Sequence, residues 1–457
     1  MSLAKYTAPR ITGVETEYGC MVSPPGDGMR VIHQIRDWVF ENNRYGLIDR
    51  HHRDWDEPPG NGGFLFNGGR LYLDMGHVEY CTAECASAMD VVRHDRAGDR
   101  ILLQAVHALG LGDRVNFIRN NIDHHTGATF GCHENYSLLR RSSLSEKNIL
   151  SLLAFLTLRI LFTGAGRVGS AGQRGAGVVL ETAAEYQISQ RADYIQNDFY
   201  EWVQHNRAII NTRDEPLADP RKYRRLHLLH GDTNVLPAAM FLKIGATRLV
   251  LDLLEINDLP AVALSDAVWT LRALSHQPEP PWHVSLLDHS QADGVEVLSR
   301  FRLRAEKRFG GRSVETDTIL ALWERVENGL SGNLESLVGL IDWVTKHHAL
   351  DVFRKSEGLD WSDPWLEAQD LEYHQLDPAR SLGLALANLD GPWADGIEES
   401  TTLTTPPYGT RAAVRSKLMR GLIERGNEYE LDWDAVIEEG AEPVHLTDPF
   451  TGNSDEE

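Results

Sequence analysis

Residues 69–85 have the sequence Gly-Arg-Leu-Tyr-Leu-Asp-Met-Gly-His-Val-Glu-Tyr-Cys-Thr-Ala-Glu-Cys, and the rest of the chain is organised around them. The alternation of polar and apolar side chains over residues 70–74 predicts a β-strand. Because successive side chains of a strand point to opposite faces, Arg70, Tyr72 and Asp74 share one face. That face carries a cation, a phenol and a carboxylate. A solvated strand alternates in the same way, so this pattern alone is compatible with a purely structural role.

A second predicted strand, Gly-Val-Glu-Thr-Glu-Tyr-Gly at residues 13–19, strengthens the functional interpretation. Glu15 and Glu17 lie on one of its faces. Two carboxylates so placed repel each other unless water or a cation screens them. Mg²⁺ binds carboxylate oxygens held at a few rigid points and completes its shell with water and phosphate. These two glutamates, with Tyr72 and Glu79 from the 69–85 stretch, therefore suggest a magnesium site.

The composition is that of a globular protein in a reducing compartment. Of 457 residues, 42% are hydrophobic and 25% charged, and four cysteines are too few for a disulfide framework. The most apolar segment, residues 149–162, is too short to cross a bilayer, and no signal peptide is visible. We therefore expect a cytoplasmic location without a membrane span.

The net charge limits the partners. Lys and Arg total 45 against 67 Asp and Glu, giving a formal charge of −22. Proteins that bind nucleic acid in general depend on a basic field, so that class is excluded.

The chain is expected to form two units. A turn-rich break at residues 389–396 separates a large domain, residues 1–395, from a small one, residues 396–457. In the small unit we predict an amphipathic helix over 411–425, a strand over 430–436 that carries Trp433, and a disordered acidic tail over 451–457. In the large unit, the Gly- and Pro-rich segment 50–63 is predicted to be an exposed loop of unassigned role.

Several motifs together resemble one family. Besides residues 13–19 and 69–85, they are His-Asp-Arg-Ala-Gly (94–98), Gly-Cys-His-Glu-Asn-Tyr (131–136), Ser-Gln-Arg-Ala (189–192), Ile-Ile-Asn-Thr-Arg-Asp-Glu-Pro (209–216) and Tyr-Arg-Arg-Leu-His (223–227). They occur in the order found in the Pup ligases and Pup deamidase/depupylases, relatives of glutamine synthetase and the carboxylate–amine ligases. The resemblance implies an α+β fold: a glutamine-synthetase-like domain with a curved, mainly antiparallel sheet packed by helices, plus a small C-terminal α/β domain.

The resemblance also implies residue roles. It places Glu15, Tyr72 and Glu79 at magnesium positions and Asp74 at the catalytic base. The ATP-contacting positions match Arg70, Thr82 and Trp433. Chemistry alone adds Glu17 to the metal set, Arg213 as a phosphate clamp, and His133 and His227 as contacts to a second metal or to phosphate.

The implied activity is ATP- and Mg²⁺-dependent ligation of the terminal glutamate side chain of a small acidic Pup-like modifier to lysines of protein substrates. The alternative is a hydrolase of the same fold that deamidates the modifier or cleaves its isopeptide bond. A small-molecule ligase and a non-catalytic binding protein are further alternatives. This chain also departs from the family by lacking one residue between Gly76 and His77. That deletion bears on whether Glu79 reaches the metal.

Overall fold

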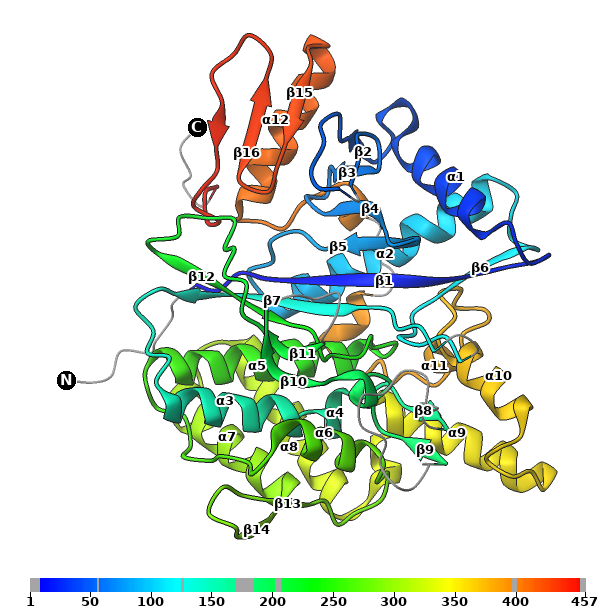
Figure 1. The fold of residues 1–457 in the computed structure, drawn as a ribbon, viewed down its shortest axis with the longest axis vertical. Coiled ribbons are helices and arrows are strands. Elements are labelled where there is room, and N and C mark those ends of the chain that lie inside the picture. Colours follow the sequence, from blue (N-terminus) through cyan, green and yellow to red (C-terminus); the bar gives the residue numbers. More distant parts are fainter. Residues whose placement is uncertain are drawn as a thin grey trace.

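The computed structural model describes residues 9–55, 57–124, 127–169, 185–201, 207–396 and 401–452. Within them a ten-stranded sheet runs through the middle of the molecule (Figure 1), in the order β10-β11-β12-β7-β1-β5-β4-β3-β2, with β6 also paired to β1. The pairs are antiparallel except β10 with β11. The strands are β1 Thr12–Val22, β2 Gly46–Ile48, β3 Gly62–Leu65, β4 Arg70–Asp74, β5 His77–Cys81, β6 Val115–Ile118, β7 Cys132–Leu139, β10 Asn197–Tyr200, β11 Ala208–Asn211 and β12 Tyr223–Leu228. The expected α+β fold with a mainly antiparallel sheet is confirmed.

Helices cover the apolar face of the sheet. Helix α2 (Ala88–Ala108) lies beneath β1, where the Thr16 hydroxyl bonds Asp95 at 3.2 Å and the Tyr18 hydroxyl bonds Asp99 at 2.8 Å. Arg119 bridges both aspartates at 2.6 Å. The motif at residues 94–98 therefore holds helix to sheet. Helix α1 (Gly28–Phe40) packs with α2 and β1 in one apolar cluster.

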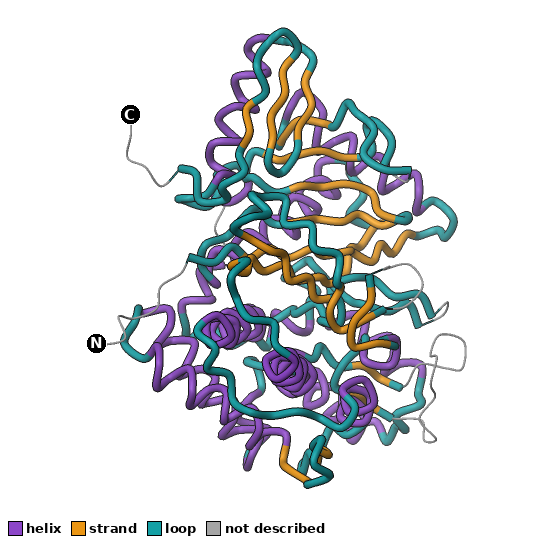
Figure 2. The backbone as a smooth tube through the Cα atoms, turned by 60° about the vertical axis from the view of Figure 1, so that its left-hand side comes forward, coloured by secondary structure: helices purple, strands orange, loops and turns teal. Residues whose placement is uncertain are grey.

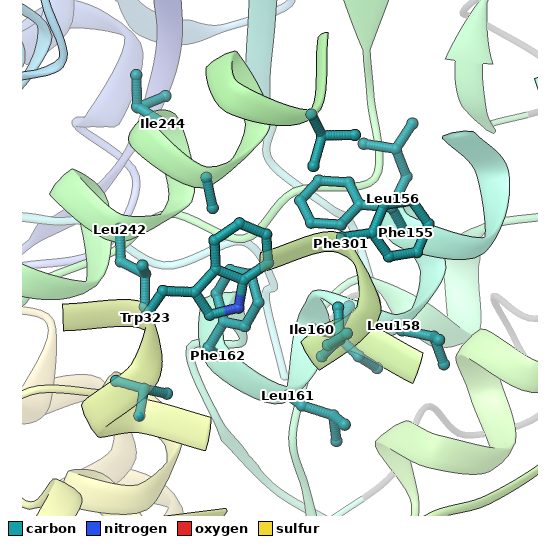
Figure 3. Packing of buried hydrophobic residues seen from close by; sticks show 14 of the residues in the cluster. Phe155, Leu156, Leu158, Ile160, Leu161, Phe162, Leu242, Ile244, Phe301 and Trp323 are labelled. Carbon is teal, nitrogen blue, oxygen red and sulfur yellow. The ribbon is translucent and has the colours of Figure 1, made fainter. Parts of the chain in front are cut away.

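A large helical layer lies below β7 and β12 in Figure 1 and is also seen in Figure 2. It shares one apolar cluster with the start of α2. It comprises α3 Glu146–Leu158, α4 Ile160–Thr163, α5 Pro237–Glu255, α6 Ala267–Ser275, α7 Gly294–Phe309, α8 Val314–Gly332, α9 Asp342–Glu357, α10 Pro364–Tyr373 and α11 Leu382–Ala385. At its centre lies the fully buried ring of Trp323 (Figure 3). The centre of this ring is 5.8 Å from the ring centre of Phe155 and 5.9 Å from that of Phe162. Such a core fixes the sheet from one side only. Two small two-stranded sheets lie outside the main sheet: β8 (Arg167–Val168) with β9 (Tyr186–Gln187), and β13 (His283–Ser285) with β14 (Gln291–Asp293).

The C-terminal elements stand at the β2–β3 end of the sheet (Figure 1). They are α12 Arg411–Arg425, β15 Tyr429–Leu431, β16 Ala435–Glu438 and β17 Val444–His445. Helix α12 has the predicted bounds. The predicted strand over 430–436 is wrong, because Trp433 lies in the turn between β15 and β16. Residues 453–457 of the expected disordered tail lie outside the described residues.

The segment 50–63 is anchored as well as exposed. Trp55 is 67% exposed, but Arg53 pairs with Asp49 at 2.9 Å and donates to the carbonyl of Leu431. None of the helices in the described part of the chain is both long and apolar enough to cross a membrane.

Candidate active site

Polar side chains from five neighbouring strands converge on the face of the sheet opposite to α2. Tyr72 on β4 pairs with Glu79 on β5, and Glu79 pairs with Glu17 on β1. Two residues earlier on β1, Glu15 pairs with His133 on β7. Cross-strand partners have Cβ atoms about 4.5–5.5 Å apart, so these groups lie side by side. The sequence therefore placed these residues on the correct face.

The shortened β4–β5 connection preserves this arrangement. It is a two-residue turn in which Met75 has φ 43° and Gly76 φ 93°. Positive φ at both central positions matches the twist of a tight hairpin, and glycine adopts it without strain. Asp74 then pairs with His77, which leaves Glu79 directly opposite Tyr72. The missing residue thus shortens the turn without removing Glu79 from the site.

A first acid–imidazole cluster consists of Glu15, His133 and His227, whose potential ligand atoms lie within 4.8 Å of one another. His133 Nδ1 lies 3.0 Å and His227 Nε2 3.9 Å from Glu15 Oε2. The buried Nε2 atom of His227 has no hydrogen-bond partner. Burial, and then the charge of Arg225, lower the pKa of His227 well below its usual value, so the ring is neutral, as metal ligation requires. These residues fit a divalent cation.

Two further side chains hold Glu15 in place. Asn135 Nδ2 donates to its Oε1 at 2.7 Å, and Arg225 Nη2 donates to the same atom at 3.3 Å. Burial alone would raise the pKa of Glu15. The hydrogen bond from His133 and the charge of Arg225 lower the pKa of Glu15 below the usual range instead. Glu15 is therefore a fixed carboxylate.

A second cluster, the acid cluster, consists of Glu17, Asp74 and Glu79, whose oxygens also lie within 4.8 Å of one another. Burial raises the pKa of Glu79 well above its usual value, and the charges of Glu17, Glu15 and Asp74 raise it further. Three carboxylates at this separation repel one another, and a bound divalent cation would relieve the repulsion. The donor set fits magnesium, which prefers carboxylate oxygens.

Arg70 projects from β4 beside the first cluster. Its Nη2 atom lies 2.9 Å from Asp49 and 2.5 Å from Glu57. Its guanidinium carbon lies 4.3 Å from the centre of the Tyr72 ring. Glu57 comes from the anchored segment 50–63, so one acid of that segment touches a predicted nucleotide contact.

A cleft of about 370 Å³ joins these features to the C-terminal elements. The predicted residues among its lining are Glu15, Arg70, Tyr72, Thr82, Arg213 and Trp433. All four predicted nucleotide contacts therefore surround one cavity, although they come from three distant parts of the chain. The acid cluster continues the same strands beyond this cavity.

The four nucleotide candidates differ in how firmly they are held. The buried Thr82 hydroxyl accepts from the backbone of Val14 at 3.0 Å and donates to the carbonyl of Ala83 at 3.1 Å. Trp433 packs edge-on against Phe64 with 5.0 Å between ring centres. Arg213 has a side chain that is 55% exposed and pairs with Glu215 at 2.7 Å. An exposed guanidinium of this kind is accessible to a phosphate.

Sequence reasoning did not assign roles to Asn135, Arg225 or Glu57. The strand pattern could have indicated the first two. Residues 223–227 alternate and place Arg225 on the face of His227, and Asn135 lies two residues after His133 on its own strand. No such pattern indicated Glu57, since its approach to Arg70 depends on the path of a long connection.

The sequence model of the family described as Pup-ligase protein matches residues 10–437. The chain belongs to this family. Among its curated relatives, the Pup–protein ligase of Acidimicrobium ferrooxidans is 33% identical, covering 98% of this chain and 97% of the relative. The depupylase of Acidothermus cellulolyticus is 35% identical, covering 94% of this chain and 90% of the relative.

Two solved Pup-ligase structures share the fold. The ligase PafA in complex with the prokaryotic ubiquitin-like protein Pup superposes with a TM-score of 0.82 at 30% identity, over 98% of this chain and 90% of that one. PafA in complex with ADP superposes with a TM-score of 0.76 at 30% identity, over 92% of this chain and 91% of that one. The resemblance inferred from the motifs is thus confirmed over the whole architecture.

Proposed function

We propose that this protein is an ATP- and Mg²⁺-dependent ligase that joins the side-chain carboxylate of the C-terminal glutamate of a Pup-like modifier to a substrate lysine. The observation that carries the proposal is the succession of a nucleotide-sized cleft, a Glu–His cluster and a carboxylate cluster along one face of the sheet. The relatives named Pup–protein ligase, and the solved complexes of PafA with Pup and with ADP, support it.

In this proposal the cleft binds ATP. Trp433 and Thr82 flank the nucleotide, while Arg70 and Arg213 face its phosphates. Glu15, Tyr72, Glu79, Glu17 and His227 would hold magnesium, which when bound neutralises charge on the phosphates. The modifier carboxylate would attack the terminal phosphate from the end of the acid cluster. The product is an acyl phosphate of the modifier, and ADP leaves.

Asp74 would act as the base that accepts a proton from the attacking lysine. It ends β4 inside the acid cluster, beside Glu17 and Glu79. A carboxylate kept ionised by nearby cations can take that proton. The amine then attacks the acyl phosphate, and phosphate leaves as the isopeptide bond forms.

The hydrolase alternative uses the same residues with water as the attacking group. The resemblance implies a long insertion between the first strand and the Arg-Leu-Tyr strand in the hydrolase branch, whereas the connection here, residues 20–67, is nearer the ligase length. The near-complete mutual coverage with the curated ligase agrees with this assignment.

The test mixes the protein with a Pup-like protein ending in glutamate, ATP, Mg²⁺ and a lysine-bearing acceptor, and measures intact masses. The expected product is acceptor plus modifier minus one water, absent without ATP and formed about 10² more slowly with Asp74→Asn. A second reaction starts from purified conjugate. Release of free modifier without any conjugation in the first reaction would assign the hydrolase, and no product in either would refute both.

A further inference from the structure

Two arginines lie next to the acid cluster and have no assigned role. Arg191 precedes the short turn 192–194 and is 2% exposed, while Arg207 directly precedes β11 and is partly buried. Nη1 of Arg191 donates to the carbonyl of Phe130, and its buried Nε atom has no partner. Among the described residues, no carboxylate lies within 4.0 Å of either guanidinium.

These arginines are close to the reacting end of the sheet. Gly131, which follows Phe130, accepts from the backbone of Glu17 at 3.2 Å. A Cβ at Gly131 would come within 2.4 Å of Glu17 Oε1, so a larger residue here would displace the Glu17 carboxylate. The ring of Phe130 lies 4.6 Å from that of His77, the strand partner of Asp74.

The positive charges of the two arginines oppose each other. Burial, and next the charge of Arg207, lower the pKa of Arg191 to about 10. Burial likewise lowers the pKa of Arg207, and Glu17 is the carboxylate that acts on both. The buried carboxylate of Asp232, which accepts from the backbone N–H of Arg191 at 3.1 Å, also acts on Arg191. A buried guanidinium is unfavourable unless an anion pairs with it. The planar forks of arginine match a carboxylate in particular.

We propose that Arg191 and Arg207 bind the α-carboxylate of the modifier's C-terminal glutamate. This inference rests on the proposed function. The pair lies at the Glu17 end of β1, whereas the nucleotide cleft lies at the Glu15 end. Holding the α-carboxylate there leaves the γ-carboxylate directed towards the phosphates. The arginines would thus determine which of the two carboxylates is activated.

The test compares two forms of one Pup-like protein, with a C-terminal carboxylate and with a C-terminal carboxamide. For the wild type we expect kcat/KM to be about 10² lower with the carboxamide, since the arginines lose their anion. Arg207→Gln should slow only the carboxylate form, so that the ratio falls below about 10. Arg221→Gln is the control, because its side chain is 88% exposed.

Fluorescence anisotropy of the two labelled modifiers provides a readout without turnover. An unchanged carboxylate preference in a folded Arg207→Gln protein overturns the inference. So does a variant that loses ATP affinity and keeps the preference, because the pair would then serve phosphate. If Arg207→Gln does not fold, Arg191→Lys is measured instead and should reduce the same ratio. A wild type that binds both modifiers equally overturns the inference and leaves ligation itself intact, whereas a wild type that conjugates neither form refutes the proposed function.

Discussion

Arg415 on α12 and Glu84, 331 residues earlier, form a two-pronged ion pair in the interior of the protein. Nη1 lies 2.9 Å from Oε1 and Nη2 2.7 Å from Oε2. The Arg415 side chain is fully buried, and Arg411 adds a second contact to Glu84 at 2.6 Å. One carboxylate that follows β5 thus anchors the C-terminal helix over the nucleotide cleft.

Glu84→Gln should destabilise the protein by about 3 kcal/mol at neutral pH, because it leaves two buried guanidinium groups without their anion. Urea unfolding measures the change. Glu438→Gln is the matched control: its partner Arg425 is 48% exposed, and such a pair contributes about 1 kcal/mol or less. Equal losses in the two variants would contradict the anchoring role.

The contribution of Glu84 to the stability of the fold should decrease as the pH falls. Burial opposes its ionisation, but Arg415 and Arg411 lower its pKa from 4.5 to about 2. A depressed pKa in the folded state stabilises the protein fully above the unfolded value and loses that effect as pH falls. The difference in unfolding free energy between wild type and Glu84→Gln should therefore be constant from about pH 8 to pH 5. It should shrink between about pH 4.5 and pH 2. A difference that grows in acid would contradict this pairing.

Trp433→Ala should weaken nucleotide binding by about 10-fold, or about 1.4 kcal/mol, while the fold persists. The indole lines the cleft from a turn and rests edge-on against Phe64. Calorimetric titration with ADP measures the affinity. Trp269→Ala, which removes a ring that is 54% exposed on α6, should leave it unchanged. Identical affinities in the two variants would remove Trp433 from the site.

Asp74→Asn should reduce turnover by about 10² with near-normal ATP affinity, because it keeps the shape of the base and removes its charge. Asp37→Asn, at a side chain that is 63% exposed, is the control. Loss of ATP affinity in Asp74→Asn would instead identify a metal ligand. Loss of thermal stability would identify a structural residue.

Magnesium with ATP should raise the melting temperature, and a chelator should reverse the rise. Ligand at about 100 times its dissociation constant stabilises by about 2.7 kcal/mol. The buried Glu79 beside Glu17 supplies the reason, since a cation removes the repulsion between them. Glu79→Gln should lose most of the magnesium-dependent part. Equal melting temperatures with and without Mg²⁺ would exclude this site.

Local patterns predicted much of the fold. Strand β4 occupies residues 70–74 as expected, and α12 has its predicted ends. The alternation of side chains along a strand also placed Arg70, Tyr72 and Asp74 on the face where the structure has them. These successes share a cause: each depends on side chains close in sequence.

The errors concern contacts between distant residues. On the predicted amphipathic helix α12, the apolar Ile423 is 40% exposed, whereas Arg411 and Arg415 are buried. A charged pair at helical spacing usually faces solvent, and nothing near it in sequence reveals Glu84. The division into residues 1–395 and 396–457 stays a prediction. We expect the second part not to fold alone, because part of its apolar cluster belongs to β2 and β3.

Because Glu15 and Glu17 are two residues apart on β1, the spacing between the two clusters is set by covalent bonds, at roughly 7 Å along the strand. The C-terminal elements and segment 50–63 line the cleft from other parts of the chain and do not set that spacing. The strand therefore keeps the distance between the two clusters constant. Removal of Thr16 would turn one of the two glutamates into the hydrophobic layer and separate phosphate handling from proton transfer.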